Sequence, residues 1–263
     1  MAGIAAVAAT VWVGAAGAAT IPVALQSNLI ALYTFEAGDA RDDSGNGNDG
    51  TLGAGAQAPS FVTDLDGTAA SFDGVDDFIS TTIDIDRDTL PQVTMGALVR
   101  LNGRGTNSGG TVFSADDGGF DRSLKIDSRQ NDEFTAFSND SGGTVGSGLG
   151  VGDGEVFFVA VSYTDGANSL LYVDLLDGTE TATLFFDNTG MSGNTLTIGT
   201  NPGFPEFFDG SIDNAFVFDR ALSQAEIEQV RDGLVPTTVI PVPATLPLML
   251  AGLGLFAAMR RRG

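Results

Sequence analysis

Hydrophobic and polar residues alternate in short runs through the middle of the chain, and Asp-Gly pairs separate many of the runs. Between Ser211 and Phe218, the side chains of Ile212, Phe216 and Phe218 recur at even positions, so we predict that they share one face of a strand. We predict strands at 29–35, 69–72, 93–101, 111–114, 123–126, 133–137, 156–163, 169–175, 181–186, 195–198 and 211–218. Many short strands joined by tight turns predict an all-β sandwich or barrel.

One helix is predicted, near the end of the patterned region. Ser223 and Glu226 have the spacing of a capping box, apolar residues follow at helical intervals, and Gly233 is a stop signal. The Gly-rich stretch 141–154 has the composition of either a linker or a long loop. We expect a loop, because neither half of the chain has enough strands for two packed sheets. Residues 20–234 are therefore predicted to form one domain.

The chain begins with an uncharged segment. The first 35 residues carry no charged side chain, and an apolar run is followed by the small residues Ala16–Ala19. This pattern predicts a secretory signal peptide at 1–19. The n-region lacks Lys and Arg, which a wrongly assigned start codon would explain. The alternative interpretation of the segment is a buried apolar strand.

The C-terminal segment carries a Pro-rich motif, an apolar run and an arginine cluster. Ile240-Pro241-Val242-Pro243-Ala244 lies in a linker at 235–245, and residues 246–263 comprise an apolar helix that reaches about 21 Å and then Arg260, Arg261 and Arg262. This order resembles the PEP-CTERM class of exosortase sorting signals, in its V-P-x-P-A subgroup, with Ile240 at the first position. The resemblance implies that the tail is held in the inner membrane of a Gram-negative bacterium. An exosortase-type processing enzyme would then cut near Pro243-Ala244 and pass the protein to the surface. A single-span anchor is the alternative.

Composition narrows the chemistry. Twelve Lys and Arg against 34 Asp and Glu give a net charge of −22, which disfavours nucleic acid and anionic lipid as partners. The chain contains no Cys and no His. Disulfides, Ser-His-Asp and Cys-His catalysis and His-bound zinc are therefore excluded.

Three segments carry a family resemblance. They are Leu32–Glu36 with the Asp43–Thr51 loop, Ala70–Ile79, and Phe208–Ser223. In order and spacing they resemble the laminin-G-like branch of the concanavalin A-like lectin and glucanase superfamily. The resemblance implies a two-sheet antiparallel jelly roll whose first and last strands lie side by side.

Core packing can be predicted around this framework. We expect Phe35, Phe72 and Phe216 to close a single double-layered β core, and Phe78 to face that core together with Phe72. Gly74 would form the tight turn between Phe72 and Phe78.

The family resemblance also implies a structural calcium between loops near the paired terminal strands. Calcium prefers six to eight hard oxygen ligands, which an acidic chain supplies readily. We predict Asp43, Asn46, Asp73 and Asp213 as contributors. The alternative is that these side chains cap turns and face water.

Glycan binding usually relies on exposed aromatic rings, and the one Trp, Trp12, lies in the predicted signal peptide. Phe204 and Phe207 lie in a proline-flanked loop and are the predicted ligand contacts, whereas Tyr163, Tyr172 and Phe208 are expected in the core. The E-x-D-x-x-E pattern of the superfamily's glucanases is absent, so no catalytic residue is predicted.

We therefore expect an exported, non-enzymatic surface or matrix protein that binds a glycan or a protein, in adhesion or biofilm. A structural coat component without a discrete ligand is one alternative. A carbohydrate-active enzyme is another, and it would require two carboxylates 5–9 Å apart in a cleft.

Overall fold

A computed structural model describes residues 19–105, 109–138, 143–187, 189–191 and 193–235. The predicted signal peptide, apart from Ala19, lies outside the described residues. So do the sorting motif with Pro241, Pro243 and Ala244, and the tail with Arg260, Arg261 and Arg262. Within the described ranges, no helix is long and apolar enough to cross a membrane.

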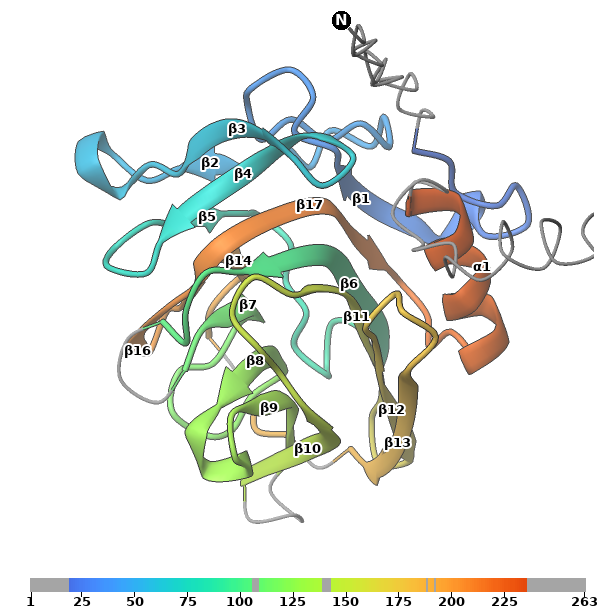
Figure 1. Cartoon of the computed structure of the whole chain (residues 1–263). Helices are drawn as coiled ribbons and strands as arrows, with labels where there is room; N and C mark the ends of the chain where they lie inside the picture. Colours follow the sequence, from blue (N-terminus) through green and yellow to red (C-terminus); the bar gives the residue numbers. More distant parts are fainter. Residues whose placement is uncertain (1–18, 106–108, 139–142, 188, 192, 236–263) are drawn as a thin grey trace, which may run out of the picture.

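The larger of two antiparallel sheets has eight strands (Figure 1). They are β1 (Leu29–Tyr33), β3 (Ser60–Asp64), β4 (Gly67–Asp73), β6 (Gln92–Leu101), β11 (Val156–Thr164), β12 (Asn168–Asp174), β13 (Glu180–Phe186) and β17 (Asp209–Phe218). Strand β17 pairs with β6 on one edge, and with β4 and then β1 on the other. The first and last strands therefore lie side by side, as the family resemblance implies.

The second sheet has seven strands. They are β2 (Thr51–Leu52), β5 (Ile79–Ser80), β7 (Thr111–Ser114), β8 (Ser123–Asp127), β9 (Glu133–Ser138), β10 (Gly143–Gly150) and β14 (Thr197–Ile198). A separate hairpin joins β15 (Thr200–Asn201) to β16 (Phe204–Phe207), and short 3-10 turns lie at Gln26–Asn28, Gly55–Gln57 and Ser128–Gln130.

Strand β10 corrects the prediction of a long loop at 141–154. Its residues pair with β9, with Gly143 opposite Ser138 and Val145 opposite Ala136. Glycine has low strand propensity, but an edge strand needs only its backbone groups to extend a ladder, and β9 supplies their partners.

Two apolar layers stabilise the domain. The first lies between the sheets and includes Phe35, Phe72 and Ile212. The second lies on the outer face of the larger sheet, where helix α1 (Gln224–Leu234) covers Phe216 and Phe218. The prediction that Phe216 shares the layer of Phe35 and Phe72 is therefore wrong, although all three belong to one domain.

A β-bulge in β17 is the physical reason. The register against β6 shifts between Asp213 and Phe216, and Asn214 adopts a left-handed φ of 48°. One extra residue reverses the direction of every later side chain. Ile212 therefore points between the sheets and Phe216 points to the helix, so the predicted shared face does not exist.

The start of α1 was predicted correctly. Helix α1 begins after Ser223, whose backbone N–H donates to the Glu226 carboxylate at 2.9 Å. The Arg220 guanidinium and this N–H together hold the pKa of Glu226 at about 2, well below its usual value. The helix ends at Leu234, one residue beyond the predicted stop at Gly233.

Candidate ligand-binding site

The outer face of the seven-stranded sheet carries a buried polar layer. Along β8, Leu124 and Ile126 belong to the core between the sheets, so Lys125 and Asp127 point outward. Both outward side chains are nonetheless fully buried. The Lys125 ammonium lies 2.6 Å from the carboxylate of Glu206, which β16 contributes, and 3.6 Å from that of Asp127.

A hollow of about 190 Å³ opens above this layer, and we call it the polar pocket. Its lining comprises Asp116, Gly118, Phe120, Arg129, Phe137, Asn201, Phe204 and Glu206. The side-chain amide of Asn201 links two of its acids, because Nδ2 donates to Asp116 Oδ2 at 3.1 Å and to Glu206 Oε2 at 3.0 Å. These two carboxylate oxygens therefore border the same small space.

Arg129 forms one wall of the polar pocket. Its guanidinium lies 5.5 Å from the ring centre of Phe120 and 5.8 Å from that of Phe137. Its Nε donates to Asp127 Oδ1 at 2.9 Å. Burial alone would raise the pKa of Asp127, but the hydrogen bonds from Arg129 outweigh burial and lower this pKa below its usual value. Arg129 is thus fixed by an ionised partner.

A second hollow, of about 440 Å³, adjoins the first, and we call it the apolar pocket. Its lining comprises Gln57, Phe78, Thr197, Thr200, Asn201, Pro202, Gly203, Phe204, Pro205 and Phe207, none of which is charged. Phe204 and Asn201 line both pockets. The Phe204 side chain is 48% exposed, so it forms an accessible aromatic ridge where the two hollows meet.

The predicted aromatic contacts can now be placed. Phe204 and Phe207 both line the apolar pocket, although they lie in strand β16 and not in a loop. The prediction that Tyr163, Tyr172 and Phe208 are core residues is confirmed, since all three are fully buried.

Phe78 corrects a core prediction. Its side chain is only partly buried and lines the apolar pocket. The neighbouring Ile79, at the start of β5, takes the core position. Adjacent residues in extended chain point to opposite faces, so only one of the two can face the core.

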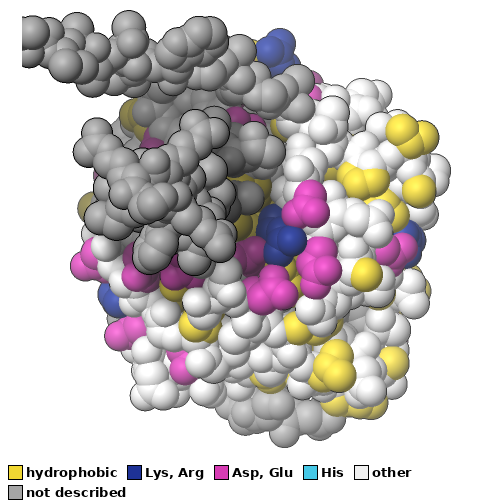
Figure 2. Space-filling view, turned by 45° about the vertical axis from the view of Figure 1, so that its right-hand side comes forward, with side chains coloured by type: hydrophobic (Ala, Val, Ile, Leu, Met, Phe, Trp, Pro, Cys, Tyr) yellow, Lys and Arg dark blue, Asp and Glu magenta, His cyan; other side chains and the backbone are white. Residues whose placement is uncertain are grey.

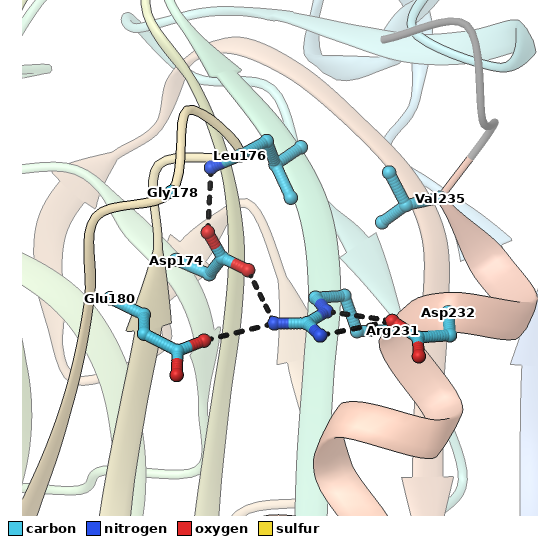
Figure 3. Close-up of a pocket in the computed structure, with 7 residues that line it drawn as sticks. All are labelled: Asp174, Leu176, Gly178, Glu180, Arg231, Asp232 and Val235. Carbon is cyan, nitrogen blue, oxygen red and sulfur yellow. Dashed lines mark hydrogen bonds and ion pairs between the residues drawn. The ribbon is translucent and has the colours of Figure 1, made fainter. Parts of the chain in front are cut away.

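A third hollow, of about 490 Å³, lies between α1 and the β12–β13 hairpin, and Figure 3 shows the seven residues that line it. Arg231 donates to Asp174 at 2.7 Å, to Glu180 at 3.0 Å and to Asp232 at 3.0 Å. Figure 2 shows acidic side chains gathered around a basic one on this side of the molecule. The Arg231 guanidinium is already bound by protein acids, so this cluster fastens the helix to the sheet.

The four predicted calcium ligands are not gathered at one site. Asp43 and Asn46 are exposed in the loop after β1, where Asp43 lies 3.3 Å from Arg41 and Asn46 Nδ2 donates to the Leu29 carbonyl at 2.7 Å. Asp73 pairs with Asp209 on β17, four residues before Asp213. At about 3.3 Å per residue, Asp73 and Asp213 are about 13 Å apart along the strand, too far to share an ion.

Asp73 instead lies with Asp76 and Asp77, and one oxygen from each can lie within 4.8 Å of the others. Asp73 Oδ1 accepts from the backbone N–H of Val75 at 2.8 Å, and Asp77 Oδ2 accepts from that of Asp73 at 2.9 Å. Hydrogen bonds of this kind are typical of turn-capping Asp residues.

Asp213 lies in a different group, with Glu36 and Asp66, which we call the Asp213 cluster. Asp213 is 1% exposed and accepts from the backbone N–H of Asp66 at 3.2 Å, whereas the buried Asp66 Oδ1 has no hydrogen-bond partner. Burial, followed by the charges of Asp66 and Glu36, raises the pKa of Asp213 to about 7. Two of these acids are buried and one of their oxygens is orphaned, but among the described residues only Asp73, Asp76 and Asp77 bring three carboxylate oxygens within 4.8 Å of one another.

The backbone supports this cluster with unusual conformations. Left-handed φ angles occur at Phe35, Leu65 and Asn214, each next in sequence to one of the three acids. Such angles are costly for residues with a Cβ and often mark functional positions. The sequence alone identifies Asp213 but not its partners. The available signals were the Phe-Glu pair after the first strand and the Asp-Gly turn at Asp66.

A protein-family model described as the concanavalin A-like lectin/glucanases superfamily matches residues 73–228, more than half of the chain. The chain belongs to this superfamily. A search of curated protein sequences finds no significant match.

Similar solved structures include domain 4 of AbnA, a GH43 extracellular arabinanase from Geobacillus stearothermophilus, in complex with arabinotriose. It has 19% identity and a TM-score of 0.57, with 79% of this chain and 98% of that chain covered. The botulinum neurotoxin serotype D binding domain has 13% identity and a TM-score of 0.57, with 80% and 53% covered. The binding domain of Paraclostridial Mosquitocidal Protein 1 has 12% identity and a TM-score of 0.57, with 78% and 52% covered. The chain spans about half the length of the two toxin domains, and at these identities the likeness shows the fold.

Proposed function

We propose that this protein is a glycan-binding module whose ligand lies across Phe204, between the polar and the apolar pocket. The observation that carries the proposal is the exposed Phe204 ring beside Asn201, Asp116 and Glu206. Sugars present apolar C–H faces that pack on aromatic rings, and hydroxyls that bond to amides and carboxylates. A ridge flanked by both kinds of group matches these two requirements.

The similar structures support a binding role. One is the domain of an arabinanase in complex with arabinotriose, and two are toxin binding domains. The two adjoining hollows favour a discrete ligand over the alternative of a structural coat component.

Binding is favoured over hydrolysis by the contacts that the two pocket acids make. The Glu206 carboxylate lies 2.6 Å from the Lys125 ammonium and accepts a hydrogen bond from Asn201 at 3.0 Å, so its oxygens are already engaged by the protein. A glycosidase needs one carboxylic acid that can donate a proton to the leaving oxygen. Because Asp116 and Glu206 both accept a hydrogen bond from Asn201, the pair is arranged to accept donors from a ligand.

A glycan array followed by calorimetry tests the proposal with a matched pair of variants. Phe204→Ala removes the ridge, and Phe186→Ala removes a ring of similar exposure, 46%, from the outer face of the other sheet. We expect Phe204→Ala to weaken binding by about tenfold, which corresponds to about 1.4 kcal/mol, and Phe186→Ala to bind like the unmodified protein. Silence across the array, or equal affinity of the two variants, would contradict the proposal.

We also propose that Asp66 and Asp213, the buried pair with the orphaned oxygen, bind a structural calcium ion near Glu36. The ion would supply positive charge to three acids that lack a basic partner, and would fasten the loop after β1 and the β3–β4 turn to the bulge of β17. Melting temperature with calcium or with chelator tests this proposal. We expect calcium to stabilise the unmodified protein and Asp73→Asn, but not Asp66→Asn. Loss of the effect in Asp73→Asn alone would place the ion at the Asp73 turn.

The proposed place of action is the cell surface, reached through a signal peptide and an exosortase-type processing enzyme, with a role in adhesion or biofilm. The support for this proposal is the sequence pattern at 1–19 and 235–263. Mass spectrometry of the native surface protein tests it. Recovery of mature material that still carries Arg260–Arg262 would refute the sorting step.

A further inference from the structure

We infer that the ligand is an uncharged oligosaccharide that occupies both pockets at once, with at least one sugar unit on each side of Phe204. This inference rests on the proposed glycan-binding function and specifies the length and charge of the ligand.

The length follows from the shared lining of the two hollows. Phe204 and Asn201 belong to both, so a chain that leaves one hollow enters the other directly. The apolar pocket, about 440 Å³, has more than twice the volume of the polar pocket, about 190 Å³. A sugar in the polar pocket alone would leave the larger hollow, and one side of the exposed ring, in contact with water.

The two hollows also differ in what they offer a ligand. The polar pocket presents carboxylate oxygens and an amide, which recognise hydroxyl groups. The apolar pocket presents Phe78, Phe207 and two prolines without any charged side chain, which suits packing against the face of a sugar ring. Hydrogen bonding in one pocket and stacking in the other would both add to the affinity of a chain that spans them.

The charge of the ligand follows from the groups around the polar pocket. Asp116, Glu206 and Arg129 line it, and Lys125 and Asp127 lie directly behind them. The two cations are engaged by protein acids, Arg129 by Asp127 and Lys125 by Glu206. Arg129 is the one basic residue among the described lining residues, and Asp127 already neutralises it, so a uronate or a sulfate would face the carboxylates of Asp116 and Glu206 without an unpaired cation.

Calorimetry with ligand series of defined length and charge tests the inference. The probes are neutral arabino-, xylo-, gluco- and manno-oligosaccharides of one to five units, with oligogalacturonates as the charged series. For the neutral series that binds, we expect affinity to rise at least tenfold between one unit and three and then level off. Oligogalacturonates of equal length should bind at least tenfold more weakly.

Two variants connect the length effect to the apolar pocket. Phe78→Ala should reduce the affinity for trisaccharides and leave that for the monosaccharide unchanged. Gln57→Ala, at an exposed position of the same pocket, provides a second test should Phe78→Ala fold poorly. Its effect should have the same direction and a smaller size.

The outcomes separate the inference from the function beneath it. If a monosaccharide binds as tightly as the trisaccharide, the two-pocket arrangement is wrong while glycan binding stands. Equal or tighter binding of oligogalacturonates would overturn the charge argument alone. If no sugar of any length or charge binds, the proposed function fails, and this inference fails with it.

Discussion

The buried Lys125–Glu206 pair offers a sharp test of how the ligand site is held together. The Lys125 side chain is fully buried, and its ammonium has two acidic neighbours, Glu206 at 2.6 Å and Asp127 at 3.6 Å. Glu206→Gln keeps the shape of the side chain and removes its charge. Removing one partner of a buried ion pair typically costs about 3–5 kcal/mol, because the other charge is left uncompensated. Asp127 remains near the ammonium, so we expect a loss at the lower end, about 3 kcal/mol.

Urea denaturation at pH 7 measures this loss. Glu228→Gln serves as the control, since this glutamate lies on the surface of α1 and should change stability by less than about 0.5 kcal/mol. The double variant Lys125→Met with Glu206→Gln removes both charges. It should be less destabilised than the sum of the two single variants, because no unpaired ammonium remains. A Glu206→Gln protein as stable as Glu228→Gln would show that the pair does not stabilise the hairpin, and our account of the polar layer would be wrong.

Three further outcomes follow from the packing. Burial, followed by the charges of Asp116 and Asp117, raises the pKa of Asp121 to about 6. The protonated carboxyl therefore stabilises the folded state below about pH 4, and this stabilisation, up to about 3 kcal/mol, is lost as the pH rises through about 6. In the Asp121→Asn variant, the free energy of unfolding should depend less on pH over this range. If the curves of the variant and the unmodified protein are parallel, the assignment is refuted. Arg231→Ala leaves Asp174 and Glu180 without their shared hydrogen-bond donor, so the free energy of unfolding measured with urea should fall by about 1–3 kcal/mol. An unchanged free energy of unfolding would mean that the cluster does not hold the helix against the sheet. Ile227→Ala, at a fully buried position on the inner face of α1, should cost about 2–5 kcal/mol by the same assay. A change below about 1 kcal/mol would place the helix outside the core.

Local patterns predicted the framework well where a strand or helix is specified by its own residues. The short apolar runs at 93–101 and 156–163 predicted β6 and β11, and the capping box at Ser223 predicted the start of α1. The sequence-based predictions were wrong where contacts with a neighbouring strand determine the conformation. Strand β10 is Gly-rich and exists because β9 offers it a ladder, and the bulge at Asn214 reversed the faces of the last strand.

The candidate site shows the same division. Phe204 and Phe207 were predicted because their proline-flanked setting indicated an exposed loop, although the structure places them in strand β16. Their polar partners in the pocket were not predicted. Asp116, Arg129 and Asn201 are distant in sequence and meet only when the β15–β16 hairpin covers β8. The calcium prediction named Asp213 together with Asp43, Asn46 and Asp73, whereas the structure places Asp213 beside Asp66 and Glu36.

By itself, then, the sequence determined the fold class, most strands, the single helix and the charge that disfavours anionic partners. These properties depend on local periodicity and on composition, which do not require knowledge of distant contacts. The tertiary structure alone decided which acids share a cluster, which aromatic ring remains exposed and where the two hollows adjoin. Strand pairing brings together residues separated by more than a hundred positions, such as Asp66 and Asp213, and no local pattern encodes that meeting.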